Sequence, residues 1–166
     1  MKVAAVTCVI LGALICSGTA ERVGAQERAR PRGEARLDYL GPDPHTVHAG
    51  LGLNVPFGTY LRVGVIGAGG ASWKDSRAAT SARADVVARF SFDPFRERAW
   101  ALSAGGGLSL RYDEVEPRRE RWRPLLALVI DLEGPRTGSV APAVQLGLGG
   151  GARLGVIVRG AGQGRR

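Results

Sequence analysis

The chain has 166 residues, of which 45% are hydrophobic and 25 are glycine, and its formal net charge is +8 at pH 7. This length suits one domain, and the glycine content exceeds the average share of about 7%. Nearly all of the positive charge comes from arginine, because Lys2 and Lys74 are the only lysines. Such a charge suits an acidic partner, for example lipid phosphate.

The first 25 residues have the layout of a secretory signal peptide. Lys2 provides a minimal positive start, an apolar run follows from Val3 to Cys16, and small residues precede a cleavage site after Ala25 or, as second choice, after Ala20. A retained membrane anchor is the alternative, but the apolar run is shorter than the roughly 20 residues that a spanning helix needs. Export, and the lack of basic-aromatic clusters, argue against a nucleic-acid partner.

Both cysteines, Cys8 and Cys16, lie inside this leader. Lipid attachment needs a small residue just before the cysteine, whereas Thr7 and Ile15 occupy those positions. The mature chain therefore has no disulfide and no cysteine metal site.

A strict two-residue alternation runs through residues 98–112. Successive side chains of a β-strand point to opposite faces, so one face of this segment is apolar and the other is small or polar. The pattern predicts a two-faced strand with an aromatic residue near each end of its apolar face, which consists of Trp100, Leu102, Ala104, Gly106, Leu108, Leu110 and Tyr112.

The same alternation predicts seven further strands. A charged, proline-interrupted and disordered lead at 26–33 precedes them, and a tail at 161–166 follows. Because the connections are short and no helix is available for parallel crossovers, we expect an all-β, antiparallel up-and-down meander that closes into an eight-stranded barrel over 34–160. The predicted strands are 34–40, 45–55, 59–69, 82–92, 98–112, 121–132, 140–149 and 152–159.

The two faces distinguish a membrane barrel from a soluble one, because only a membrane barrel turns its apolar face outward. Here the other face is mostly Gly, Ala and Ser, which suits a narrow lumen. We expect its charges to pair around trapped water, and its positive excess predicts that some arginines near strand ends reach headgroups or water. The predicted lumen-facing charges are Arg62, Arg83, Asp85, Arg89, Arg111, Arg123 and Asp131, joined by Arg36, Asp38, Arg153 and Arg159.

Connections and aromatic residues also favour a membrane. Longer polar loops at 71–81 and 113–120 alternate with tight turns at 56–58, 93–97 and 133–139, which predicts external loops on one side and periplasmic turns on the other. Aromatic residues gather near strand ends, as they do at membrane interfaces. The predicted aromatic belt is Tyr39, Phe90, Phe92, Trp100, Tyr112 and Trp122.

This pattern over residues 34–160 resembles the small eight-stranded outer-membrane barrels, the class of OmpX and the OmpA transmembrane domain. The resemblance implies a monomer in the bacterial outer membrane with a structural or surface-interaction role, in contact with lipid, including lipopolysaccharide, and with an unknown protein through loops 71–81 and 113–120. Such proteins commonly end in an aromatic residue, whereas this chain ends in Arg165 and Arg166. Val158 would then have to serve as the end of the strand that carries the insertion signal, and the residues after it would form a tail.

Three alternatives stay open. One is a soluble periplasmic, lipocalin-like barrel that binds an apolar ligand. The second is an outer-membrane lipid-modifying hydrolase. The third is an anion-lined pore, although eight strands rarely leave a continuous channel.

Catalytic chemistry has little support in the sequence. The mature chain has only two histidines, His45 and His48. His48 shares its strand face with Ser91, Ser103 and Ser109, but these lie on strands that do not neighbour its own, and a dyad requires hydrogen-bond contact. We therefore expect no catalytic residue and no cofactor. No carboxylate lies at ligand spacing from the histidines, so we expect no metal site either.

Overall fold

The computed structural model describes residues 31–74, 77–95, 97–114 and 122–160. The predicted signal peptide, most of the lead and the tail at 161–166 lie outside the described residues. Within the described residues, no helix is long and apolar enough to cross a membrane. The strands are β1 (Arg32–Gly41), β2 (His45–Phe57), β3 (Leu61–Lys74), β4 (Arg77–Ser91), β5 (Ala101–Asp113), β6 (Trp122–Glu133), β7 (Val140–Leu148) and β8 (Ala152–Gly160).

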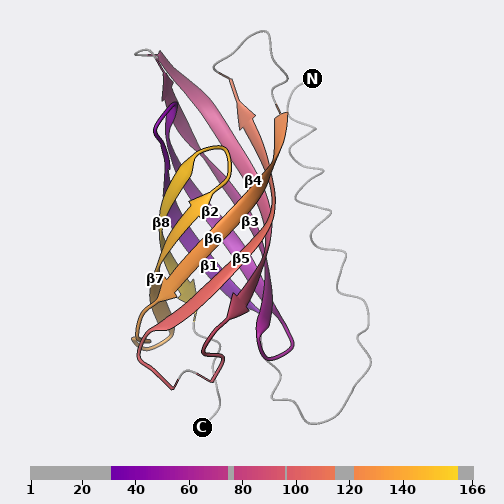
Figure 1. Cartoon of the computed structure of the whole chain (residues 1–166). Coiled ribbons are helices and arrows are strands. Elements are labelled where there is room, and N and C mark those ends of the chain that lie inside the picture. The colour runs from indigo at the N-terminus through magenta and orange to yellow at the C-terminus, as the bar shows by residue number, and fades with distance from the viewer. Residues whose placement is uncertain (1–30, 75–76, 96, 115–121, 161–166) are drawn as a thin grey trace.

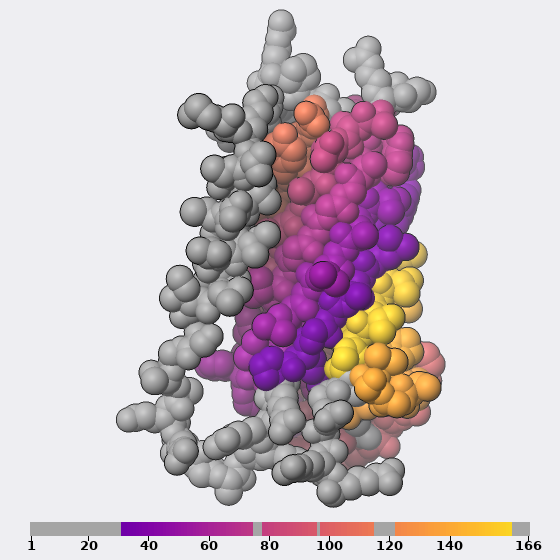
Figure 2. Space-filling model, turned by 180° about the vertical axis from the view of Figure 1, so that it is seen from behind, coloured from indigo at the N-terminus to yellow at the C-terminus, as the bar shows by residue number. Residues whose placement is uncertain are grey.

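Each strand pairs antiparallel with the next, and β8 returns to pair with β1, so the sheet closes into a barrel. The strands run obliquely around the wall (Figures 1 and 2). Closure leaves no pair of free sheet edges, which is why a single sheet is a complete fold here. The predicted all-β, eight-stranded meander is confirmed.

An even number of strands brings the first and last strands to the same end of the barrel. We call this the terminal end; it carries the start of β1, the end of β8 and the connections 58–60, 92–100 and 134–139. The opposite, distal end carries the connections 42–44, 75–76, 114–121 and 149–151.

The predicted polar loop at 71–81 is wrong. β3 continues to Lys74 and β4 begins at Arg77, so the connection is only residues 75–76. The alternation persists through the hairpin, where Ser72 and Ser81 are buried in the interior and Trp73 is exposed. Polar residues in this segment therefore mark the inner face of a strand and not a loop.

The other predicted strand boundaries differ less from those in the structure. Arg32 and Gly33, predicted to belong to a disordered lead, pair with Asn54 and Leu53 in the sheet. Asp113, the first residue of the other predicted loop, ends β5, while residues 115–120 of that loop lie outside the described residues. The longest connection at the terminal end is 92–100, so tight turns do not dominate that end as predicted.

The apolar face points outward along every strand. The side chains of Leu108 and Leu128 are 64% and 59% exposed, whereas Asp131, three residues after Leu128, is 0% exposed. Where the pattern blurred in sequence, the structure resolves it, because Ile66 points inward and is buried. Together with the closed topology, this places a broad apolar surface around the outside of the barrel and polar side chains within it.

The wall is lower on one side. β6 pairs with β7 only from Leu128 to Glu133, because β7 ends at Leu148. The β7–β8 hairpin therefore stops well short of the β3–β4 hairpin at the distal end (Figure 1), and β8 occupies only the lower part of the wall in the reverse view (Figure 2).

Candidate functional site

The interior of the barrel is the most chemically distinctive part of the molecule. Alternation along each strand directs every second side chain inward, and many of these are charged. Six arginines are buried there, and six carboxylates accompany them, of which Asp113 has a side chain 9% exposed. These residues are Arg36, Arg83, Arg89, Arg111, Arg153 and Arg159, with Glu34, Asp38, Asp85, Asp113, Asp131 and Glu133.

A central cluster crosses the lumen. Asp38 on β1 accepts hydrogen bonds from Arg36 Nε and Nη2 at 2.8 and 2.9 Å and another from Arg83 on β4. Arg83 Nε lies 3.0 Å from Asp85 Oδ2, and Arg153 Nη1 on β8 donates to the same oxygen at 2.9 Å. Because β1 and β8 do not neighbour β4, these ion pairs join opposite walls.

A second cluster lies toward the terminal end. Arg159 on β8 donates to Glu34 at 3.1 Å, to Asp131 at 2.7 Å and to Glu133 at 3.4 Å. Arg89 Nε on β4 lies 3.1 Å from Asp131 Oδ2. Two arginines and three carboxylates thereby connect four strands.

A third cluster lies toward the distal end around Asp113. Arg111, which is 2% exposed, lies 2.8 Å from this carboxylate and also donates to Thr46 at 2.9 Å and to the Gly150 carbonyl at 3.1 Å. Arg123 reaches the same carboxylate at 2.9 Å, but its side chain is 52% exposed. Arg123 therefore lies at the rim and not in the closed lumen.

The structure brings most of the predicted lumen charges together. Arg83, Asp85, Arg89, Arg111 and Asp131 are all buried. Arg62 and Arg123 are less enclosed, and each lies at one mouth of the barrel.

Three interior carboxylates were missed in the sequence: Glu34, Asp113 and Glu133. Each lies at a strand end, and the last two fell in predicted connections. The signal for them was present, since stepping by two from Asp38, Arg111 and Asp131 reaches each one. With them included, the six buried arginines have five buried carboxylates and the partly exposed Asp113 as counter-charges, so the positive excess lies with the arginines at the two mouths.

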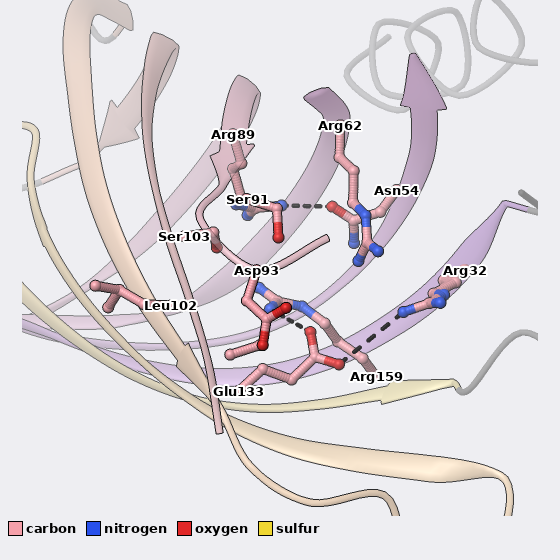
Figure 3. Close-up of a pocket in the computed structure, with 11 residues that line it drawn as sticks. Arg32, Asn54, Arg62, Arg89, Ser91, Asp93, Leu102, Ser103, Glu133 and Arg159 are labelled. Carbon is pink, nitrogen blue, oxygen red and sulfur yellow. Dashed lines mark hydrogen bonds and ion pairs between the residues drawn. The ribbon is translucent and has the colours of Figure 1, made fainter. Parts of the chain in front are cut away.

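A pocket of about 30 Å³ lies at the terminal end, among mostly polar side chains (Figure 3). Arg62 points into it from β3, and Arg32, Arg89 and Arg159 lie around it (Figure 3). This volume suffices for one or a few waters. The central ion pairs lie beyond it along the lumen.

The aromatic residues form two groups, one at each end of the barrel. At the terminal end, Phe90 stacks on Tyr60 at 5.5 Å and meets Phe92 edge-on at 5.6 Å between ring centroids. At the distal end, Tyr112 and Trp122 lie 5.2 Å apart. Of the other predicted belt residues, Tyr39 near the distal end is 43% exposed and Trp100 beside the terminal end of β5 is 55% exposed.

The buried histidine has a serine partner that the sequence did not reveal. His48 Nε2 lies 2.9 Å from Ser81 Oγ, and Ser81 donates its hydroxyl proton to Asp113 at 2.7 Å. Ser81 was hidden in the predicted loop, whereas Ser91, Ser103 and Ser109 make no hydrogen bond with His48 in the described part of the chain. A serine nucleophile gives its proton to a base such as histidine, whereas the Ser81 hydroxyl donates here to Asp113.

Among the described residues, no group of three His, Cys, Asp or Glu side chains is arranged to hold a metal ion.

No protein-family model matches the chain, and no curated protein matches it. Solved structures do. The crystal structure of Neisserial surface protein A (NspA) superposes with a TM-score of 0.59 at 14% identity, covering 80% of this chain and 96% of that one. The outer membrane protein OprG of Pseudomonas aeruginosa gives 0.57 at 7% identity, covering 81% and 90%.

The N-terminal β-barrel domain of Pseudomonas aeruginosa OprF gives a TM-score of 0.55 at 12% identity, covering 78% of this chain and 96% of that one. The chain has the fold of the small outer-membrane barrels. At these identities the likeness concerns the fold alone, and function rests on the chain's own residues.

Proposed function

We propose that this protein is an outer-membrane β-barrel with a structural or surface-interaction role. One observation carries the proposal: the barrel is inside-out relative to a soluble protein. Charged residues such as Asp38 and Arg111 are 0% and 2% exposed, while outward residues such as Leu51 and Leu126 are 72% and 77% exposed. Water would penalise that exterior at roughly 25 cal/mol per Å², whereas hydrocarbon would not.

The charged interior favours this proposal over the soluble, lipocalin-like alternative. That alternative requires an apolar interior that holds an apolar ligand, but the described interior is crossed by the ion pairs of Asp38 and Asp85 with arginines from other strands. Such a charged interior does not suit an apolar ligand.

The proposal assigns the terminal end to the periplasm and the distal end to the cell exterior. The start of β1 and the end of β8 lie at one end, and the residues before β1 carry the predicted export signal, which supports this orientation. The distal connections, including 42–44, 75–76 and 114–121, would then meet a protein partner or lipopolysaccharide. Arg123, half exposed at the distal rim, offers a guanidinium to lipid phosphates.

Conduction and catalysis are not part of the proposal. The central ion pairs cross the lumen between β1, β4 and β8, which supports a closed barrel. The order of the His48, Ser81 and Asp113 hydrogen bonds supports a structural role for that cluster. We expect the barrel to work as a monomer without a cofactor.

Fractionation of cells that produce the full chain tests the location. We expect the protein in the outer-membrane fraction after carbonate and urea washing, with migration in detergent gels that changes on boiling. Recovery in the soluble periplasmic fraction would overturn the proposal.

Orientation is tested by inserting the same epitope at either end. An epitope between residues 75 and 76 should be labelled by antibody on intact cells, and one beside Gly138 should be labelled only after the outer membrane is opened. The reverse pattern would overturn the assignment of the two ends.

A further inference from the structure

The pocket at the terminal end is lined by residues of seven strands, with its polar side chains concentrated on five of them. Arg32 comes from β1, Asn54 from β2, Arg62 from β3, Arg89 from β4 and Arg159 from β8. Figure 3 shows Arg62 reaching into the space between the side chains of its neighbours. Because most of the lining residues lie on neighbouring strands, the pocket belongs to the barrel wall and not to a loop.

The charges of this pocket are compensated unevenly. Arg159 has three carboxylate partners, and Arg89 pairs with Asp131. Arg62, by contrast, makes no hydrogen bond or ion pair with any residue that the structure describes. Arg32 approaches only Glu133, at 4.0 Å. Two guanidiniums at this mouth therefore keep donors for another partner.

Buried donors strengthen the case. Arg89 is 4% exposed, yet its Nη2 has no hydrogen-bond partner in the described structure. This nitrogen forms an ion pair with Glu34 Oε1, but the distance of 3.9 Å is too long for a hydrogen bond. Arg32 Nη1 is likewise buried without a hydrogen bond. A buried donor without an acceptor costs about 1–3 kcal/mol, which an incoming oxyanion would recover.

Two carboxylates line the pocket, Asp93 and Glu133, and Glu133 pairs with Arg159 at 3.4 Å and with Arg32 at 4.0 Å. Asp93 accepts backbone hydrogen bonds from Glu97 and Arg98, both at 3.1 Å, so its charge is partly used to hold the 92–100 connection. The guanidinium of Arg136, in the connection 134–139, adds to the positive potential at Arg32 and Arg62.

We propose that the terminal-end mouth binds a small tetrahedral oxyanion of the phosphate type, with Arg62 as its main ligand. Guanidinium groups match the oxygens of phosphate with paired N–H donors. Arg32 and Arg89 Nη2, which makes no hydrogen bond in the described structure, supply further donors, and Ser91 and Ser103 line the same space. The ion pairs across the central lumen stop the anion from passing onward, so the site holds its ligand and does not conduct it.

The oxyanion has two possible sources, free phosphate and a lipid headgroup. The barrel wall separates the pocket from the outer surface, where Tyr60 and Phe90 form the aromatic group of this end. The same chemistry serves both sources, so the experiment has an arm for each. The inference depends on the barrel interior and not on cellular location, so its failure would leave the fractionation result unaffected.

Isothermal titration calorimetry with inorganic phosphate tests the site on the full chain in dodecyl maltoside, a detergent without phosphate. We expect saturable binding by the wild type and affinity at least about tenfold lower for Arg62→Gln, because one charge-assisted hydrogen-bonding group is lost. Arg98→Gln is the matched control, since Arg98 is exposed at the same end but does not line the pocket. Boiling-dependent gel migration verifies that each variant is folded.

The lipid arm repeats the titration in nanodiscs that contain phosphatidylglycerol. Phosphate binding in these nanodiscs equal to that in maltoside supports free phosphate as the ligand. Phosphate binding that is present in maltoside but lost in these nanodiscs supports a lipid headgroup that occupies the same arginines. No saturable binding in maltoside, or equal affinity for the wild type and folded Arg62→Gln, would overturn the proposal.

Discussion

At the scale of single residues, burial decides what each arginine contributes. Arg111 and Arg123 both pair with Asp113, at 2.8 and 2.9 Å, but their side chains are 2% and 52% exposed. A surface ion pair contributes about 0–1 kcal/mol, whereas removing one partner of a buried pair costs roughly 3–5 kcal/mol because the other charge stays behind. Two ion pairs of nearly equal length can therefore contribute differently to the free energy of unfolding.

We predict that Arg111→Gln lowers the free energy of unfolding by roughly 3 kcal/mol or more, and that Arg123→Gln lowers it by less than about 1 kcal/mol. Urea titration of the reconstituted barrel, followed by tryptophan fluorescence, measures both. Equal effects of the two substitutions would contradict the distinction between lumen and rim.

At the scale of the strand, glycines on the inner face of β5 permit close approach of β4. A Cβ atom on Gly107 would lie 1.9 Å from the Val86 carbonyl oxygen, which is a clash with backbone and not with a flexible side chain. On β3, a Cβ atom on Gly67 would meet nothing within 4 Å. The high glycine content is therefore a packing requirement at some positions only.

We predict that Gly107→Ala strongly reduces the yield of the heat-modifiable folded form, because β4 and β5 would have to separate locally. Gly67→Ala should change the unfolding free energy by no more than about 0.5 kcal/mol. Refolding yields on detergent gels compare them, and normal folding of Gly107→Ala would show that the two strands have more freedom than their register indicates.

At the scale of the whole molecule, the account depends on which solvent covers the outside. Leu128 lies midway along β6 and is 59% exposed, while Val140 begins β7 at the terminal end and is 40% exposed. In a bilayer, an arginine on the lipid face costs about 2–4 kcal/mol at the midplane and about 0–1 kcal/mol near the interfaces.

We therefore predict a clear destabilisation for Leu128→Arg and little for Val140→Arg, measured by urea unfolding in phosphatidylcholine vesicles. If the exterior were in water, both arginines would be tolerated alike, so similar unfolding free energies would contradict a lipid-facing wall.

The topology could be predicted because the two-residue alternation of apolar and polar side chains persists along the strands, even in segments whose composition resembles that of a loop. Trp100 to Tyr112 showed the outward face directly, and the pairing of Asp38 with Arg36 lies on the predicted inner face. The limits were physical: Ser72 and Ser81 look like loop residues because a polar lumen has the composition of a loop. Contacts across the lumen, such as Arg83 with Asp38, join strands far apart in sequence, and alternation alone carries no information about which residues meet there.

Accessibility of a nitroxide in vesicles tests the central claim most directly. With Cys8 and Cys16 replaced by serine, a label on Leu128→Cys should collide more with oxygen, which concentrates in hydrocarbon, than with a water-soluble nickel chelate. A label on Asp43→Cys, in the exposed distal connection, should show the opposite preference. A label at position 128 that the nickel chelate reaches as readily as it reaches position 43 would contradict a barrel whose outer wall faces lipid.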